Sequence, residues 1–196
     1  MTELKTFFDE IEPSFKQFIS TSHVEFEFRL GKRNRGTFDT NIGLEKFTRI
    51  REGLIKYNGW ESVKKTTDTA YYKDSIRLII DEDTDAQVQV NKHKLFKHDY
   101  SHKPLDVRFS IASEVPMDGS MEIEYTDSKQ RQRESFVRQN LSIDLTIVSG
   151  QVDMDSEEDT VYQVEFEIID PLKVTNQNIF YNLVYKIQDV LRLLLD

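Results

Sequence analysis

Apolar residues recur at helical spacing in three segments of the chain. The first covers residues 2–20, where Pro13 is expected to break or restart the helix. The second covers residues 44–57 and should end at the Asn-Gly pair that follows it. The third, from about 176 to 195, is apolar over a wide face. Such a face packs against a core, so these helices should cover apolar surface elsewhere in the protein.

Between Trp60 and Asp170 the pattern changes to strands with alternating apolar and polar positions. The predicted strands are "TAYYKD", "IRLIID", "AQVQVNKHKLF", "LDVRFSIASEV", "QRQRESFVRQ", "LSIDLTIV" and "VYQVEFEIID", and an earlier segment, "VEFEFRLG" (24–31), makes about eight. The short turn signals "KDS", "MDGS" and "RQN" favour antiparallel meander connections over parallel crossovers. Residues 149–159, "SGQVDMDSEED", are interpreted as an acidic loop and the best candidate for disorder.

The first and last predicted strands each carry two glutamates at alternate positions on one face. Glu25 and Glu27 lie opposite the apolar residues of "VEFEFRLG", as Glu165 and Glu167 do in "VYQVEFEIID". Like charges on neighbouring strands repel, and carboxylates are uncommon in strands. Two such pairs indicate either faces exposed to water or a shared cation.

The strands between them also have one apolar and one charged or polar face. The charged and polar positions include Arg77, Lys92, Lys94, Arg108, Ser110, Glu114, Lys129, Arg131, Arg133, Asp144 and Thr146. For "KQRQRESF" the alternative is a charged edge strand that discourages aggregation. The assignment of Lys92 and Lys94 needs a bulge or phase change, because Val88 and Val90 share their parity.

If the apolar faces pack outward under the helices, the charged faces turn inward. The strands then close into a barrel, which also removes exposed sheet edges. We therefore predict an α+β protein: a closed eight-stranded antiparallel β-barrel, or tunnel, with a polar lumen and flanking helices. A single domain over residues 1–196 is expected, with an N-terminal helix over 2–20, barrel strands from about 24 to 170 and a C-terminal helix over about 176–195.

A lumen of this kind constrains the chemistry. Glutamates that converge on one spot bind a hard divalent cation such as Mg²⁺ or Mn²⁺ through oxygen. Lys and Arg further along the tunnel bind a polyanion, and Arg suits phosphate through bidentate contacts. A metal ion beside a cationic clamp is the apparatus of phosphoryl transfer.

Composition narrows the remaining function classes. The net charge of −9 argues against broad electrostatic binding of nucleic acid, so an anionic ligand needs a local cluster of cations. The chain has no cysteine, which excludes disulfides, cysteine-based zinc sites and a cysteine-phosphatase mechanism. Acids among the first apolar residues argue against a signal peptide, and no apolar run has the length of a membrane span. A soluble intracellular protein is expected.

The motifs resemble those of the triphosphate tunnel metalloenzymes, and more narrowly the metal-dependent RNA triphosphatases of fungal and large DNA virus mRNA capping systems. The resemblance runs from Val24 to Asp170. It rests on "EFEFRLG" and "VEFEI", with "IRLII", "VNKHK", "VRFSIASE", "KQRQRESF" and "IDLT" between them in the expected order. A lone ExE is a weak signal, whereas the ordered set is specific.

Carried over by position, the resemblance implies that Glu25, Glu27, Glu165 and Glu167 bind the metal. It implies that Glu114 orients or activates the attacking water. The phosphate-holding cations would be Arg77, Lys92, Lys94, Arg108, Lys129, Arg131 and Arg133, of which Arg77, Arg108, Arg131 and Arg133 would also act in catalysis.

Three further positions of the lumen bear on the assignment. Asp144 matches another acidic position of the family, and Gln163 stands where some members carry a third glutamate. Arg29 replaces the lysine that the small-molecule branch usually carries in its ExExK, which favours the capping branch.

The implied activity is hydrolysis of the γ-phosphate of 5′-triphosphate RNA, the first step of mRNA capping, with hydrolysis of nucleoside triphosphates alongside it. The alternatives are a triphosphatase for small substrates, such as tripolyphosphate or thiamine triphosphate, and a non-catalytic barrel that binds polyphosphate. The small size and the lack of a nucleotidyl-transferase lysine motif indicate a free-standing triphosphatase or an isolated domain, and a guanylyltransferase is a candidate partner. A viral origin would place the protein in the host cytoplasm or nucleus, and the sequence leaves metal preference and oligomeric state open.

Overall fold

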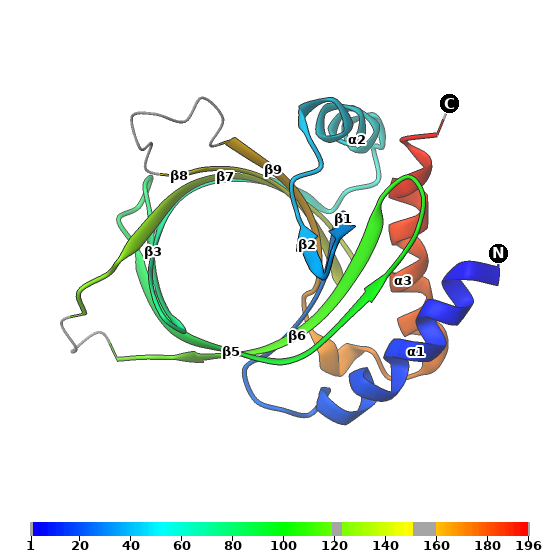
Figure 1. Ribbon diagram of the computed structural model, residues 1–196, viewed down its shortest axis with the longest axis horizontal. Helices are drawn as coiled ribbons and strands as arrows, with labels where there is room; N and C mark the ends of the chain where they lie inside the picture. Colours follow the sequence, from blue (N-terminus) through cyan, green and yellow to red (C-terminus); the bar gives the residue numbers. More distant parts are fainter. Residues whose placement is uncertain (1, 119–122, 151–159, 196) are drawn as a thin grey trace.

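The computed structural model describes residues 2–118, 123–150 and 160–195. Its main feature is an antiparallel sheet in which eight strands close into a barrel in the order β1-β6-β5-β4-β3-β7-β8-β9, and the pairing of β1 with β9 completes the ring (Figure 1). The bounds are β1 Val24–Asn34, β3 Ser62–Lys73, β4 Ile76–Asp81, β5 Gln87–Tyr100, β6 Asp106–Pro116, β7 Asp127–Arg138, β8 Leu141–Gly150 and β9 Thr160–Ile168. The predicted fold class is confirmed.

The helices lie outside the ring, to one side of it in Figure 1. They are α1 (Thr2–Phe18), α2 (Leu44–Lys56) and α3 (Gln177–Arg192), and a short 3-10 helix, η1 (Pro171–Lys173), precedes α3. α1 contacts α3, β5 and β6, while α2 lies against β9 and α3. The Asn176 side chain caps α3 by accepting a hydrogen bond from the backbone N–H of Ile179.

The hydrophobic core lies between the outer wall of the barrel and the helices. Phe26 and Phe28 of β1 and Phe109 of β6 are fully buried there. Phe180 of α3 stacks on Phe15 of α1 with ring centroids 4.0 Å apart. Because alternate residues of a strand face opposite ways, the outward phenylalanines turn the intervening charged residues of β1 into the lumen.

Pro13 does not break the first helix, contrary to expectation. α1 runs unbroken through this exposed proline. Ile11 and Phe15 on either side of it are 0% and 3% exposed. Packing of both turns against the core therefore outweighs the backbone hydrogen bond that proline cannot donate.

The strand connections differ from a simple meander at two places. In the barrel β1 pairs with β6 and β9, so the connection from β1 to β3 through α2 joins non-adjacent strands. β6 pairs with β1 and β5, whereas β7 pairs with β3 and β8, so "MDGS" lies in a connection between non-adjacent strands. β3 begins well before the predicted "TAYYKD", and a short strand that was not predicted, β2 (Thr37–Asp39), pairs with the end of β1. Of the predicted acidic loop, Ser149 and Gly150 belong to β8 and the other nine residues lie outside the described part of the chain.

β5 needs no phase change before its lysines. Val90 pairs with Arg77, and Val88 pairs with Ile79. Arg77 and Ile79 line the lumen, so the two valines lie on the same face of β5 as Lys92, which lines it too. The register of β5 against β6 shifts later, between Lys94 and Phe96. That irregularity returns Phe96 to the outer core, where it packs 6.1 Å from the Phe109 ring.

Candidate active site in the tunnel lumen

The lumen contains a polar cavity of about 410 Å³. Most of the predicted site residues line it: Glu25, Glu27, Arg29, Arg77, Lys92, Glu114, Lys129, Arg131, Arg133, Asp144, Gln163, Glu165 and Glu167. They come from seven strands that are far apart in the sequence, and only the closed ring brings them together. Burial of so many charges requires that acids and bases be paired with one another or with a ligand.

The four predicted metal ligands lie on the two strands that close the barrel. Glu27 stands directly opposite Glu167, and Arg29 stands opposite Glu165. Glu27 and Glu165 also bind Arg29 from either side, through Nη2 at 3.0 Å and Nε at 2.9 Å. Arg29 thus occupies the space between two of the four acids.

Burial and neighbouring charges together lower the pKa of one of these glutamates and raise the pKa of two others. Burial alone would raise the pKa of the Glu165 carboxyl, but Arg29 and Arg133 outweigh it and lower that pKa. Burial would likewise lower the pKa of Arg29, and Glu165 and Glu27 reverse the effect. Burial and the charge of Glu27 raise the pKa of Glu25 to about 7, and burial and the charge of Glu25 raise that of Glu167 to about 7.

The donor set on these two strands fits a hard divalent cation. The pKa values of Glu25 and Glu167 are near 7 because both carboxylates are buried and too little positive charge surrounds them. A bound cation would lower both pKa values and keep the carboxylates ionised. Oxygen ligands of this kind suit Mg²⁺ or Mn²⁺. Within the described residues, no three of these carboxylates already converge in coordination geometry, because Arg29 and Lys92 contact three of the four.

A second network joins β4, β5 and β6 to β1. Lys92 contacts Glu25 and lies 2.8 Å from Glu114. Arg77 Nη1 approaches Glu114 to 3.9 Å. Burial would lower the pKa of Lys92, but Glu27, Glu25 and Glu114 raise it, so the lysine stays charged. Glu114 is about one-third exposed and is held from two sides by these cations.

β7 forms the cationic wall of the lumen with Lys129, Arg131 and Arg133 at alternate positions. Arg131 donates from Nε to Asp68 at 2.6 Å, and Arg133 lies 3.6 Å from Asp144. Burial would lower the pKa of Arg133, and Glu165 and Asp144 raise it.

Two donors in this part of the lumen have no hydrogen-bond partner among the described residues: Arg133 Nε and Thr146 Oγ1. Unsatisfied buried donors are costly unless a ligand accepts from them. Phosphate oxygens are acceptors that would do so.

Two predicted phosphate-binding residues do not line the cavity. Lys94 is exposed and pairs with Ala112 just before the register shift of β5. Arg108 instead binds Asp99 through two hydrogen bonds, at 2.6 and 2.8 Å, and stacks over Phe38 of β2 at 4.5 Å. The guanidinium of Arg108 therefore already binds a protein carboxylate. Its phosphate-binding role stays a prediction, and this arrangement does not favour it.

Several residues of the lumen were not predicted. Asp68, which is 8% exposed, binds Arg131, and no acidic pattern along β3 indicated it. Tyr72, in the predicted strand "TAYYKD", was not among the predicted site residues but lines the cavity beside Arg77. Asp68 and Tyr72 lie an even number of positions apart on β3, so their side chains lie on the same face of the strand. This relation could have been predicted only if β3 had been recognised as starting at Ser62.

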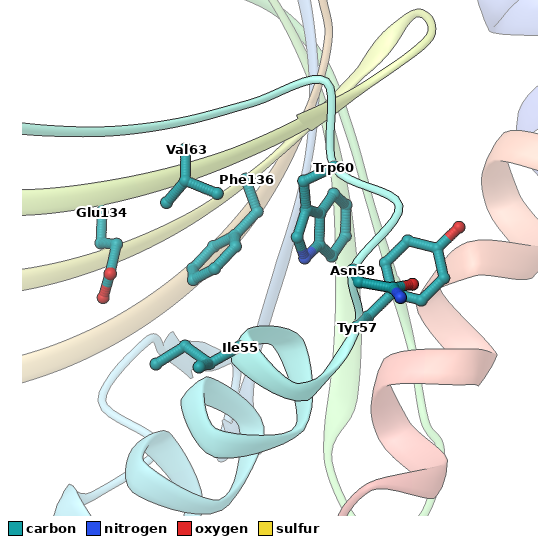
Figure 2. Close-up of a pocket in the computed structure, with 7 residues that line it drawn as sticks. All are labelled: Ile55, Tyr57, Asn58, Trp60, Val63, Glu134 and Phe136. Carbon is teal, nitrogen blue, oxygen red and sulfur yellow. The ribbon is translucent and has the colours of Figure 1, made fainter.

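A separate groove of about 340 Å³ lies on the outer wall, where the end of α2 meets β3 and β7. Its apolar lining residues include Ile55, Trp60, Val63 and Phe136 (Figure 2). Glu134 at its edge is bound by Arg51 of α2 at 2.5 Å. The residues that line this groove include no cluster of cations like that of the lumen, so we do not assign phosphate binding to it. No described helix is long and apolar enough to cross a membrane.

Comparison with known proteins gives a family and several solved folds. The family model described as the mRNA capping enzyme, beta chain, matches residues 55–196. The RNA triphosphatase Pct1 of S. pombe is 18% identical, with a TM-score of 0.78 over 96% of this chain and 91% of that one. A second structure of Pct1, in complex with the Spt5 CTD, is 17% identical, with a TM-score of 0.75 over the same shares.

The RNA triphosphatase domain of a trifunctional mimivirus mRNA capping enzyme is 15% identical. Its TM-score is 0.69, over 98% of this chain and 97% of that one. At these identities the structures show a shared fold. No curated protein sequence matches the chain.

Proposed function

Because the chain belongs to the family of the mRNA capping enzyme beta chain, we propose that it is an RNA 5′-triphosphatase that removes the γ-phosphate from triphosphate-ended RNA. The observation that carries this proposal is the division of the lumen into an acidic seam on β1 and β9 and a cationic wall on β7. An acidic seam suits a divalent cation, and a cationic wall suits a polyphosphate.

Glu25, Glu27, Glu165 and Glu167 would hold the cation, for which we propose Mg²⁺ or Mn²⁺. When bound, it would supply positive charge against the γ-phosphate oxygens. Arg29 bridges Glu27 and Glu165 and would have to release at least one of them to admit the ion.

The protein's own groups position the reactants. Arg131 and Arg133 would neutralise the phosphates, and the free donors Arg133 Nε and Thr146 Oγ1 would donate hydrogen bonds to phosphate oxygens. Glu114, held by Lys92 and Arg77, would orient a water for in-line attack on the γ-phosphorus. The anhydride bond then breaks, orthophosphate leaves, and the RNA keeps a diphosphate end. A guanylyltransferase consumes such an end, so an enzyme of that class is the proposed partner.

Phosphate release from triphosphate-ended RNA, with and without Mg²⁺ or Mn²⁺, tests the proposal. We expect release that depends on the metal and is lost in Glu25→Ala and Glu165→Ala, while circular dichroism stays like that of the wild type. Glu82→Ala is the matched control, because this glutamate is exposed and binds Thr69 and Gln130 outside the lumen. Metal-dependent turnover that survives in both lumen variants would contradict the ligand assignment.

The same assay separates the alternatives. A triphosphatase for small substrates would hydrolyse tripolyphosphate with no advantage for RNA in direct competition. A non-catalytic barrel would bind these compounds and release no phosphate.

A further inference from the structure

The groups that line the tunnel are arranged in order along its strands. On β9 the lining residues run Val161, Gln163, Glu165 and Glu167 from the start of the strand inward. On β7 the cations Lys129, Arg131 and Arg133 run inward from the strand's start. Neighbouring strands are antiparallel, so the starts of β7 and β9 lie at the same end of the barrel as the ends of β3 and β8.

Among the described residues, the lining at that end changes from carboxylates to aromatic and apolar groups. Tyr72 is the second-last residue of β3, and Val148 of β8 and Val161 of β9 line the same end. Lys129 is exposed there, whereas Glu165 and Glu167 lie four and six residues further along β9 than Val161. The mouth is therefore suited to a flat apolar group on an anionic chain.

Tyr72 is held in place from both sides. Its backbone C=O accepts a hydrogen bond from the Thr126 N–H at 3.0 Å, and it pairs with Arg77 across to β4. The Arg77 guanidinium lies 5.6 Å from the centre of the Tyr72 ring. Arg77 also reaches Glu114 at 3.9 Å, so one side chain connects the aromatic ring with the glutamate proposed to orient the water.

The spacing matches a nucleotide. Four residues of an antiparallel strand span about 13 Å, which is the separation along β9 between Val161 and Glu165. An extended triphosphate with its ribose has a similar reach. A γ-phosphate at the acidic seam therefore places the α-phosphate near Lys129 and the first base at the mouth.

From this order we propose that Tyr72 is the stacking platform for the first base of the substrate and thereby selects nucleotide triphosphates over inorganic polyphosphate. The inference rests on the proposed function and adds a substrate-contacting residue that the phosphate chemistry does not need. Any base can stack on an aromatic ring, so Tyr72 would recognise that a base is present without distinguishing which base it is.

Steady-state kinetics on two substrates test the platform. In Tyr72→Leu, which keeps apolar volume but removes the ring, KM for triphosphate-ended RNA should rise about tenfold with kcat little changed. Hydrolysis of tripolyphosphate, which has no base, should stay at the wild-type level, and Tyr72→Phe should behave as wild type on both. Tyr71→Leu is the matched control, because Tyr71 faces outward and packs on Tyr125 at 5.9 Å.

The two-substrate design distinguishes the possible failures. An equal loss on both substrates would mean that Tyr72 acts only by supporting Arg77 or the fold, and an unchanged KM for RNA would also overturn the inference. Wild-type protein that hydrolyses neither substrate would overturn the proposed function instead. Calorimetric binding of triphosphate-ended RNA and of tripolyphosphate to wild type and Tyr72→Leu would still decide whether the ring contributes.

Discussion

Arg29 illustrates how single residues maintain the lumen without a ligand. Its guanidinium lies between Glu27 and Glu165, and the acids raise its pKa although burial opposes this. Glu25 and Glu167 beside it have pKa values near 7. The arginine thus serves as an internal counterion that allows four glutamates to share one seam.

Removal of that counterion should be costly. We expect Arg29→Ala to lower the free energy of unfolding by about 2 kcal/mol, below the range for fully buried pairs because the side chain is 29% exposed. Arg29→Lys should recover part of the loss. Urea unfolding at neutral pH measures both variants, and an Arg29→Ala protein as stable as wild type would contradict the counterion role.

Asp99 gives a pH-dependent test at the same scale. Its hydrogen bonds from Arg108 lower the pKa of its carboxyl below the usual value. A carboxyl with a lowered folded-state pKa stabilises the protein above its unfolded pKa of about 3.9, and this contribution is lost as pH falls through the folded-state pKa. The wild type should therefore be more stable than Asp99→Asn at pH 6, and the difference should shrink below about pH 4. A difference that is constant from pH 6 to pH 3 would show that the ion pair is not its source.

At the scale of elements, α3 contributes a stripe of buried apolar residues to the core between the helices and the barrel wall. Its buried residues, Phe180, Leu183, Val184, Ile187, Val190 and Leu191, form one stripe. Phe180 contacts the Phe15 ring of α1 and lies 6.5 Å from Phe109 of the barrel. The helix therefore joins α1 to the outward face of β6, and the same packing keeps the charged face of β6 turned inward.

Truncation of the central ring should test this role. Phe180→Ala is expected to cost about 3–5 kcal/mol, because it removes a fully buried aromatic side chain from a close-packed site. Leu172→Ala, in η1 next to the helix, is the matched control, since Leu172 is 67% exposed and its truncation should change little. Thermal unfolding of both variants makes the comparison, and equal melting temperatures would argue against the core position of α3.

At the scale of the whole molecule, the barrel closes where its acids face one another. β1 and β9 come from opposite ends of the barrel's sequence and lie side by side in the ring (Figure 1). Glu27 stands opposite Glu167 across their seam. Like charges at a closing seam oppose closure, and a bound cation would relieve that opposition.

Divalent metal should therefore stabilise the closed barrel. At a hundredfold excess over Kd, binding to the folded state adds about 2.7 kcal/mol, which corresponds to a rise of several degrees in Tm for a chain of this size. Mn²⁺ titrations followed by thermal unfolding should show the rise in wild type and in Glu82→Ala. Glu25→Ala and Glu165→Ala should show little of it, and an undiminished rise in both would place the metal elsewhere.

Much of this architecture could be predicted from local pattern. Alternation in β1 and β9 identified the glutamates and their common face, since side-chain parity along a strand depends on neighbouring residues alone. The same reasoning was less reliable where packing overrides local preference. Pro13 lies inside α1, and the lysines of β5 keep the phase of Val88 and Val90.

By itself, the sequence determined which side chains share a face, and thereby an acidic pair on each of two strands and a basic face between them. Only the tertiary structure decided which of these faces meet, because cross-strand register and barrel closure depend on residues far apart in the chain. Register placed Asp99 against Arg108 and Asp68 against Arg131, and it left Lys94 exposed and Tyr72 at the mouth. Charges of the same type therefore differ in function according to the partner that the fold provides.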